Sequence, residues 1–431
     1  MTPELAGTGG LVALIALLAL GCPVGIAMIA VGFVGFAAVI GIGPALSVLE
    51  RGAVETATNY SFTIVPLFIL MGALVSRAGL SGDLFLAARR FIGHRPGGLA
   101  VAGISASAAF SAVSGSSLAT ASTMTRVAYP EMRAQGYDRR LAAGSLAAGG
   151  TLGIMIPPSI ALLLYALITE QSVGEMFLAG ILPGLLAFAL YAATAALMGH
   201  IWKTRSEDDS PLGSLGLAMR RFAPVVMLFT LVMGGLYGGF FTPTEAGGAG
   251  AALALGFALW RGIGWQGFIG ALDETVRLSA MLFVILIGAA VFGFFLSVSR
   301  LSFEMVDLVR NSGLGPYQVL LAILIFYVVL GCFMESLAMI LLTVTIFYPL
   351  IVEAGFDPVW FGVIAVVTVE TGLITPPVGM NLFVVKSGAD DLALRDVYAG
   401  VLPFVAADLV RLTILVAFPA ISLWLPRMLV Q

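Results

Sequence analysis

Two stretches of the chain repeat one pattern, SLATASTMTRVAYPEMRAQGYDRRLAAGSLAAGGTLGIMIPP at residues 117–158 and SLAMILLTVTIFYPLIVEAGFDPVWFGVIAVVTVETGLITPP at residues 336–377. They align without a gap at a shift of 219 residues, and ten of the 42 positions are identical. The matched positions include an SLA triplet, a Tyr-Pro pair and a final Pro-Pro pair. A repeat of this kind predicts a fold built from two related halves.

Each copy contains the same corner between two helices. Gly136 and Gly355 suit a helix C-terminus, and Asp138 and Asp357 suit the N-cap of the next helix. These matches therefore have a local structural explanation, which holds whatever the function of the chain is.

The charges at this corner differ between the copies. Residues 345–359 contain no basic residue and include Glu353 and Asp357, whereas residues 126–140 contain four arginines, Arg126, Arg133, Arg139 and Arg140. Because Lys and Arg are enriched on the cytoplasmic side of membranes, we expect the two halves to be inverted relative to each other. The polar linker at residues 200–222 has basic ends, so we expect it to be cytoplasmic and to join the halves.

The composition indicates whether the chain folds in water or in a membrane. Of the 431 residues, 60% are hydrophobic and 10% charged, against about 45–50% and about 25% in soluble domains. Apolar stretches of about 20 residues follow one another almost end to end, which predicts an all-α polytopic membrane protein with roughly ten to twelve crossings. We expect the run at residues 11–40 to be a retained first helix, interrupted at Gly21-Cys22-Pro23. The net charge of −3 argues against nucleic-acid binding.

Helix breaks occur at matching places in both halves. Residues 114–117 and 331–336 interrupt apolar runs, and Pro-Pro pairs follow at residues 157–158 and 376–377. Proline cannot continue helical hydrogen bonding, so carbonyl groups are freed, and at membrane depth these groups suit a cavity or a cation. Helix N-termini beside them suit an anion. The pattern predicts two re-entrant helical hairpins and two broken helices around two cation sites and one anionic substrate.

Ionisable residues deep in apolar runs are functional candidates. They are Glu335, Glu370, Lys386 and Asp408. Glu370 aligns with Thr151, so it is not part of the repeated scheme. A structural hydrogen bond, a bound proton and a contact to substrate all remain open for Glu370.

Matched helix breaks in two inverted halves indicate a transporter, and two other classes of function compete with this interpretation. An intramembrane enzyme could use Glu335, Glu370 or Asp408, but these acids occur singly, without a neighbouring His or second acid, so we predict neither a catalytic site nor an organic cofactor. A non-transporting scaffold would not require two matched sets of breaks. Within the transporter class, a stand-alone Na⁺- or H⁺-coupled dicarboxylate symporter is the alternative.

Five motifs point to one family. In chain order they are PLFILMGALVSRAG (66–79), SAVSGSSLAT (111–120), GTLGIMIPPSI (150–160), GGFFTPTEAGG (238–248) and GLITPPVGMN (372–381). They closely resemble the large, DctM-type membrane subunit of tripartite ATP-independent periplasmic (TRAP) transporters. The resemblance covers essentially the whole chain.

The resemblance implies a Na⁺-coupled importer of carboxylates, such as a C4-dicarboxylate or sialic acid, in the inner membrane of a bacterium or archaeon. It implies two or more coupling Na⁺ ions, a periplasmic substrate-binding protein and a small four-helix membrane subunit, here on a separate chain. It further implies an elevator-type motion of the ion transporter superfamily kind. We expect the N-terminus to be periplasmic.

Together the repeat and the resemblance divide the chain into five parts. These are scaffold helices (1–60), a first repeat with hairpin and broken helix (61–170), scaffold helices with the linker (171–280), a second, inverted repeat (281–390) and a C-terminal helix (391–431).

The family's sites transfer to this chain residue by residue. The resemblance implies one Na⁺ site at Ser111, Ser114, Gly153, Ile156 and Pro158, and another at Gly331, Gly372, Thr375 and Val378, mostly through backbone carbonyl groups. Substrate contacts are expected at Ser116, Ser117, Ser159 and Asn381, although the serines could equally be ordinary helix caps.

Overall fold

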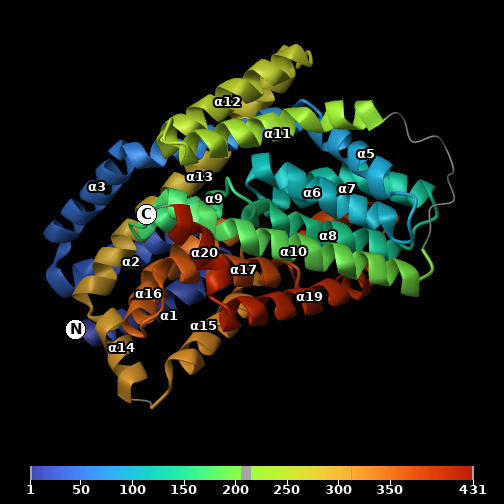
Figure 1. Cartoon of the computed structure of the whole chain (residues 1–431). Coiled ribbons are helices and arrows are strands. Elements are labelled where there is room, and N and C mark those ends of the chain that lie inside the picture. The colour runs from blue at the N-terminus through green and yellow to red at the C-terminus, as the bar shows by residue number, and fades with distance from the viewer. Residues whose placement is uncertain (1, 205–214, 312, 430–431) are drawn as a thin grey trace.

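The computed structural model describes residues 2–204, 215–311 and 313–429, and within these ranges every regular element is a helix (Figure 1). Seven helical segments of the described chain are long and apolar enough to cross a membrane, and five shorter apolar helices accompany them. The number of crossings expected from apolar stretches is reached only when the shorter helices are included. The prediction of an all-α polytopic membrane protein is confirmed.

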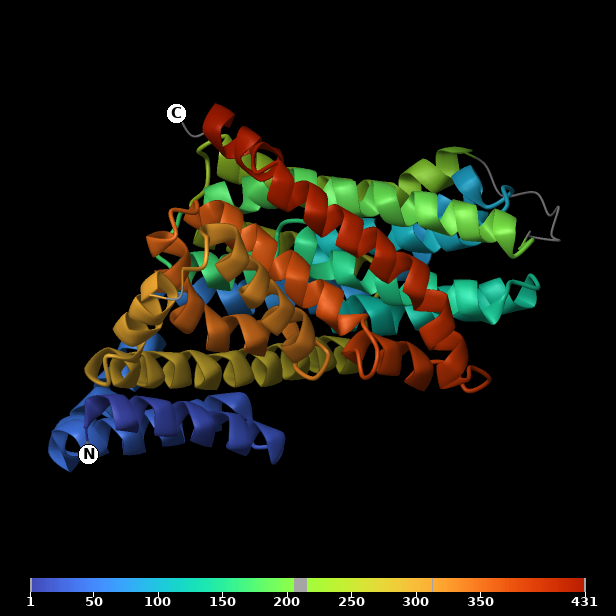
Figure 2. The same cartoon turned by 90° about the horizontal axis from the view of Figure 1, so that it is seen from below.

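The first apolar run forms two helices, so the prediction of a single interrupted helix is wrong. α1 (Pro3–Ala19) and α2 (Val24–Ile40) pack side by side at one edge of the molecule (Figure 2). Gly21 adopts a positive φ of 81°, and Pro23 has no N–H group to continue the helix. The chain therefore reverses at this turn instead of bending within one helix.

An outer group of helices packs along one side of the hairpins and broken helices, and it includes residues 64–92 from the start of the first predicted repeat. The longest, α13 (Trp265–Val298), packs against α2 and α4. The remaining members are α3 (Ile42–Thr58), η1 (Tyr60–Thr63), α4 (Ile64–Arg77), α5 (Leu80–Ile92), α11 (Leu215–Tyr237) and α12 (Pro243–Trp260). α12 begins with a capping box in which Thr242 and Glu245 bond reciprocally.

The two copies of the repeat form the same series of helices. The first comprises α6 (Gly98–Ser114), α7 (Ser117–Ala134), α8 (Arg139–Met155), α9 (Ile160–Ile168) and α10 (Val173–Ile201). The second comprises α15 (Pro316–Gly331), α16 (Ser336–Glu353), α17 (Pro358–Leu373), α18 (Met380–Ser387) and α19 (Leu394–Ala417), preceded by α14 (Leu301–Asn311) and followed by α20 (Ala420–Leu429). In Figure 1 the α6–α7 pair lies toward the right and the α15–α16 pair toward the left.

The corners between these helices have the predicted caps. Gly136 and Gly355 have positive φ angles of 72° and 80°. The side chain of Asp138 accepts a hydrogen bond from the N–H of Arg140, and that of Asp357 accepts from the N–H groups of Val359 and Trp360. The local sequence thus determines both corners.

The second segment of each broken helix packs against the hairpin of the other half. α9, which follows α8 after the first break, packs against α16 of the second hairpin (α15–α16). α18, which follows α17 after the second break, packs against α7 of the first hairpin (α6–α7). This arrangement is matched in side-chain contacts: Tyr129 donates to Asp391 over 2.9 Å, and the hydroxyl of Tyr348, its equivalent in the repeat, accepts from Gln171 over 3.2 Å. Each hairpin is therefore held by the opposite half.

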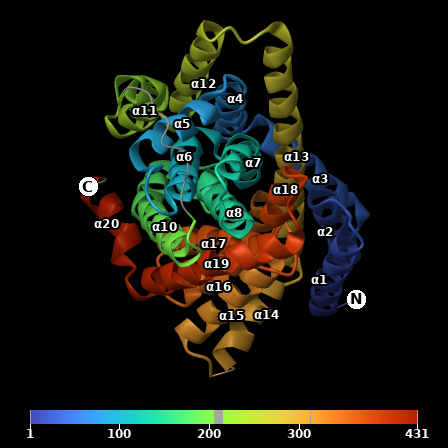
Figure 3. The same ribbon diagram turned by 90° about the vertical axis from the view of Figure 1, so that its right-hand side faces the viewer.

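α8 lies at the centre of the assembly. It contacts α6 and α7 of its own half, α10, and α17, α18 and α19 of the other half (Figure 3). All of its residues from Leu141 to Met155 are buried. The helix is rich in Gly and Ala, which allows its neighbours to approach closely.

The predicted linker at residues 200–222 is only partly described. Its interior, residues 205–214, lies outside the described residues, and α11 already begins at Leu215. The expected loop is therefore shorter at its C-terminal end than predicted, because Arg220 and Arg221 already belong to a helix, where Arg220 is exposed and Arg221 half-buried.

Candidate functional site: two helix breaks and a buried carboxyl group

The tip of the first hairpin lies on the first helix break. A methyl group on Gly153 would lie 2.5 Å from the carbonyl oxygen of Ser116. One on Gly115, at the tip, would lie 3.6 Å from the carbonyl oxygen of Pro158. Because the approach to Ser116 involves a backbone atom, hairpin and broken helix can meet this closely only with glycine at position 153.

The first predicted ion-site set gathers around this contact. Ser114 shares a hydrogen bond of 2.8 Å with Thr120 and directly precedes Gly115 at the tip. The carbonyl of Ser111, one turn earlier, accepts from the N–H of Gly115 over 3.3 Å. Ile156 ends α8 in an extended conformation, and the following Pro157-Pro158 bond is cis.

The second hairpin meets the second break in the same way. A methyl group on Gly331 would lie 3.0 Å from the carbonyl oxygen of Val369 and 3.1 Å from Cα of Gly372. The N–H of Gly379 donates to the carbonyl of Cys332 over 3.0 Å, which joins the end of the break to the hairpin. The second predicted set is thus also concentrated at one crossing.

Thr375 and Val378 lie inside this second break. The hydroxyl of Thr375 donates to the carbonyl of Thr371 over 2.6 Å, which leaves its oxygen lone pairs free to accept. Val378 follows the cis Pro376-Pro377 bond and precedes Gly379, whose φ is 60°. Each break thereby combines interrupted backbone carbonyl groups with hydroxyl groups, a donor set that suits a hard cation.

Glu370 connects the two hairpins. Its side chain is fully buried, and it accepts hydrogen bonds from Ser117 and, over 2.7 Å, from Ser336. These serines are equivalent in the repeat, and each is the first residue of the second helix of its hairpin. Sequence reasoning left the role of Glu370 open, because nothing local indicates which side chains surround it.

The residues predicted to contact substrate have mixed surroundings. Ser116 and Ser159 cap α7 and α9 by accepting from the N–H groups of Ala119 and Leu162. The hydroxyl of Ser117 is engaged by Glu370. Asn381 is fully buried, and its Oδ1 atom has no hydrogen-bond partner among the described residues. Asn381 therefore offers an available acceptor beside α8.

The other ionisable candidates differ in position. Glu335 caps α16 by accepting from the N–H groups of Leu337 and Ala338. Lys386 is half-buried in the last turn of α18. Asp408 and Arg411 form a fully buried ion pair of 2.9 Å, and neither side chain is accessible to solvent.

A polar network surrounds this ion pair. Tyr191 donates to Asp408 over 2.7 Å and shares a 3.0 Å hydrogen bond with Thr151, while Thr371 donates to Asp408 over 3.4 Å. Sequence reasoning missed Tyr191, Thr151 and Thr371 as members. One signal could have found Tyr191, because it aligns with Arg411 once the repeat is shifted by 220 residues, the shift that pairs Gly180 with Gly400.

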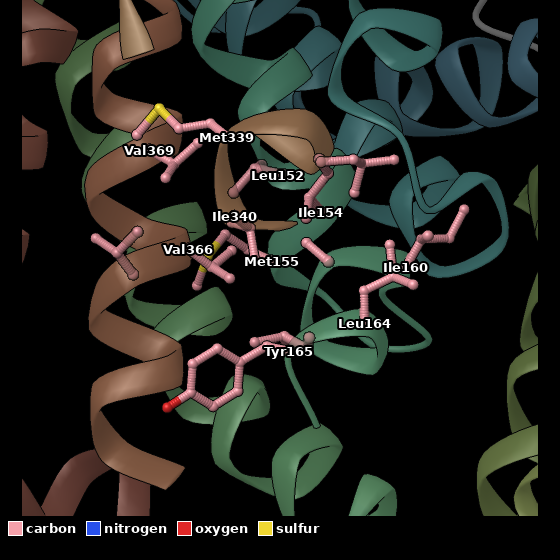
Figure 4. Close-up of a cluster of buried hydrophobic side chains, with 14 of the residues drawn as sticks. Leu152, Ile154, Met155, Ile160, Leu164, Tyr165, Met339, Ile340, Val366 and Val369 are labelled. Atoms are coloured by element: carbon pink, nitrogen blue, oxygen red, sulfur yellow. The ribbon is translucent and has the colours of Figure 1, made fainter. Parts of the chain in front are cut away.

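Apolar side chains pack between the first break and the second half. Figure 4 shows Leu152 and Met155 facing Met339, Ile340, Val366 and Val369, with Ile160 farther to the right. All of them are at most 4% exposed. This packing keeps the polar atoms of the breaks in a water-poor environment, where their interactions with an ion are stronger.

A cavity of about 920 Å³ lies between the outer helices and the second hairpin. It is lined from α3, α9, α13, α14 and α16. Four acidic residues and one arginine contribute to its lining, namely Glu55, Glu170, Asp307, Glu353 and Arg310. The charged part of its lining is therefore mainly negative.

Comparison with known proteins explains this architecture. Residues 11–421 match the family described as the tripartite ATP-independent periplasmic transporter, DctM component. The chain belongs to this family. It is thus a multi-pass membrane protein and the large permease component of a TRAP transporter.

Two curated relatives and one solved structure illustrate the likeness. The chain is 36% identical to the C4-dicarboxylate TRAP transporter large permease protein DctM of Pseudomonas aeruginosa, over 87% of this chain and 88% of that one. It is 34% identical to the sialic acid TRAP transporter large permease protein SiaM of Vibrio cholerae, over 97% and 98%. The crystal structure of the Alcanivorax borkumensis YdaH transporter matches with a TM-score of 0.61 at 16% identity, covering 88% of this chain and 89% of that one. At that identity the likeness concerns the fold alone.

Proposed function

We propose that this TRAP permease imports a carboxylate across the bacterial or archaeal inner membrane and couples the import to Na⁺. The observation that carries the proposal is the meeting of each hairpin tip with a proline-broken helix, at Gly153 and Ser116 in one half and at Gly372 and Gly331 in the other. Each meeting gathers interrupted carbonyl groups and hydroxyl oxygens in a buried setting, which suits Na⁺.

The predicted sets are the proposed ion ligands. Ser111, Ser114, Gly153, Ile156 and Pro158 would hold one Na⁺, and Gly331, Gly372, Thr375 and Val378 a second. In support, the structure brings members of each set to one crossing of hairpin and break.

The proposed substrate region lies between the two breaks. The first turns of α7, α9, α16 and α18 begin there, and their N–H groups and dipoles favour an anion. The free acceptor of Asn381 and the hydroxyl groups of Ser116 and Ser159 add polar contacts. Ser117 would contribute its backbone N–H, because its hydroxyl bonds to Glu370. The names of the relatives support a carboxylate, since C4-dicarboxylates and sialic acid are both organic acids.

We further propose that the second repeat is inverted in the membrane, with the arginine-rich corner of the first repeat in the cytoplasm and the N-terminus in the periplasm. The cavity between the outer helices and the second hairpin would then open toward the periplasm, where the excess of acidic over basic residues in its lining would attract Na⁺. The hairpins and broken helices (61–170 and 281–390) would move as the transport part in an elevator-like step. Residues 1–60 and 171–280 would act mainly as scaffold. Residues 391–431, predicted as a single C-terminal helix, instead contain the two helices α19 and α20.

The partners follow from the tripartite family. A periplasmic binding protein would deliver the substrate, and a small four-helix membrane subunit on a separate chain would complete the scaffold. We propose a role in transport without catalysis, since the buried acids serve as helix cap, hydrogen-bond acceptor and ion-pair partner.

Reconstituted transport tests the proposal. The purified chain is placed in liposomes with an imposed Na⁺ gradient, with or without the small subunit and a binding protein loaded with radiolabelled succinate or sialic acid. We expect uptake only when both partners and the Na⁺ gradient are present, and none with a K⁺ gradient. Uptake without the partners would contradict the tripartite assignment, and uptake without a Na⁺ gradient would contradict the coupling.

A further inference from the structure

The carboxyl group of Glu370 has a position that nothing in the repeat requires. Its equivalent in the first half is Thr151, whose hydroxyl bonds to Tyr191 over 3.0 Å and lies in a different polar network. The two copies of the repeat therefore differ at this position, and a single acid accepts hydrogen bonds from both halves.

The geometry of the acid matches this double use. Ser117 donates to Oε2 of Glu370, and Ser336 donates to Oε1 over 2.7 Å. A carboxyl group offers two oxygen atoms on one flat unit, so it can accept from two donors that approach from different helices. We call the contact from Ser117 through Glu370 to Ser336 the bridge. Both serines are 1% exposed, so the bridge is closed to solvent.

The bridge lies between the two proposed ion sites. Ser117 follows Ser116, whose carbonyl oxygen faces Gly153 of the first site. On the other side, Glu370 precedes Gly372 on α17, and Gly372 touches Gly331 of the second site. A continuous chain of contacts thus joins one hairpin tip and its break to the other tip and its break.

We propose that Glu370 is a positioning residue that ties the tips of the two hairpins to α17, so that an ion bound at one break raises the affinity for an ion at the other. This inference rests on the proposed function, because it takes both breaks as Na⁺ sites. The bridge makes the two tips one mechanical unit, and occupation of one site then fixes the geometry of the second.

A Na⁺ titration of the purified chain with its small subunit in nanodiscs tests the inference without transport. The readout is the unfolding temperature as a function of Na⁺, with choline as the control ion. We expect a Hill coefficient above one for the wild type. In Glu370→Ala it should fall to about one, with a half-saturating Na⁺ concentration about tenfold higher.

Two kinds of variant separate bridging from other roles. Glu370→Gln keeps a flat group that accepts from one serine and donates to the other, so it should retain most of the cooperativity. Ser117→Ala and Ser336→Ala each open the same bridge, so the double variant should lose little more cooperativity than the stronger single variant. Ser145→Ala removes another buried hydroxyl, bonded to Ala142 within α8, and should leave the Hill coefficient unchanged.

The outcomes distinguish the two proposals. A cooperative Na⁺ response that persists in Glu370→Ala would overturn the bridge and leave the Na⁺ sites intact. A Glu370→Gln variant that loses as much cooperativity as Glu370→Ala would also overturn it, because the cooperativity would then depend on the acid itself and not on the bridge. A wild-type chain without any Na⁺ response would overturn the proposed coupling and, with it, this inference.

Discussion

Gly144 and Gly400 meet backbone to backbone where α8 crosses α19. A methyl group on Gly144 would lie 2.0 Å from the carbonyl oxygen of Gly400, and one on Gly400 would lie 1.9 Å from the carbonyl oxygen of Arg140. The crossing connects the two halves of the repeat, so its spacing influences how the whole repeated part packs.

Gly144→Ala should therefore destabilise the protein. Alanine favours helix more than glycine does, but the methyl group forces α8 away from α19, and overpacking of this kind costs about 1–3 kcal/mol. The unfolding temperature in detergent micelles should fall. Gly248→Ala in α12, where a methyl group would meet nothing within 4 Å, is the matched control and should leave it unchanged or higher. Equal unfolding temperatures for both variants would contradict the predicted crossing.

Asp408→Asn should be strongly destabilising. The change leaves Arg411 as a buried charge without its counter-charge, and breaking a buried pair costs about 3–5 kcal/mol. Asp408→Asn combined with Arg411→Met removes both charges and should recover part of the loss in denaturant unfolding. The exposed pair of Asp273 and Arg277 is the control, because Asp273→Asn should change little. A double variant less stable than the single one would argue against a purely structural ion pair.

Thr375→Ala should reduce Na⁺ dependence more than it reduces stability. Thr375 contributes a hydroxyl oxygen inside the second break, and its hydrogen bond to the Thr371 carbonyl is worth only about 0.5–1.5 kcal/mol. Thr368→Ala removes an equivalent bond to the carbonyl four residues earlier on the same helix, over 2.7 Å, without touching the break. Na⁺-dependent uptake and unfolding temperature are measured for both. Equal losses of transport and stability in the two variants would support a structural role for Thr375.

The hydrogen bond from Tyr129 to Asp391 should weaken in acid. The hydrogen bond from Tyr129, and after it the one from Arg133, holds the pKa of the Asp391 carboxyl below its ordinary value of about 3.9. The stability it contributes is therefore complete above about pH 4 and is lost as the pH falls through the lower pKa of the folded state. Unfolding temperatures between pH 3 and pH 7 should decline less steeply in Tyr129→Phe than in the wild type.

The equivalent tyrosine provides the control for this pH dependence. Tyr348 bonds to Gln171, which does not titrate, so Tyr348→Phe should lower the unfolding temperature by the same amount at every pH in this range. A reduced acid sensitivity in Tyr348→Phe would show that the effect of Tyr129→Phe does not come from Asp391.

Much of the fold could be predicted because its signals are local. Apolar runs, glycine at helix ends and aspartate at helix starts act within a few residues, and the corners at Gly136 and Gly355 are formed as expected. At Gly21-Cys22-Pro23 the sequence predicts an interruption and the structure has a reversal, since sequence does not show whether a chain continues or turns back after a break. The sets of candidate site residues could be transferred, but their contacts could not.

The sequence by itself determined that this protein folds in a membrane, that it contains an internal repeat, and where its helices break. The first depends on composition, the second on the aligned residues, and the third on the missing N–H of proline. Only the tertiary structure decided which breaks and side chains meet. Ser117 and Glu370 are 253 residues apart, and Tyr191 and Asp408 are 217 apart. Contacts over such separations depend on the packing of the two halves against each other, in which each broken helix packs on the hairpin of the other half.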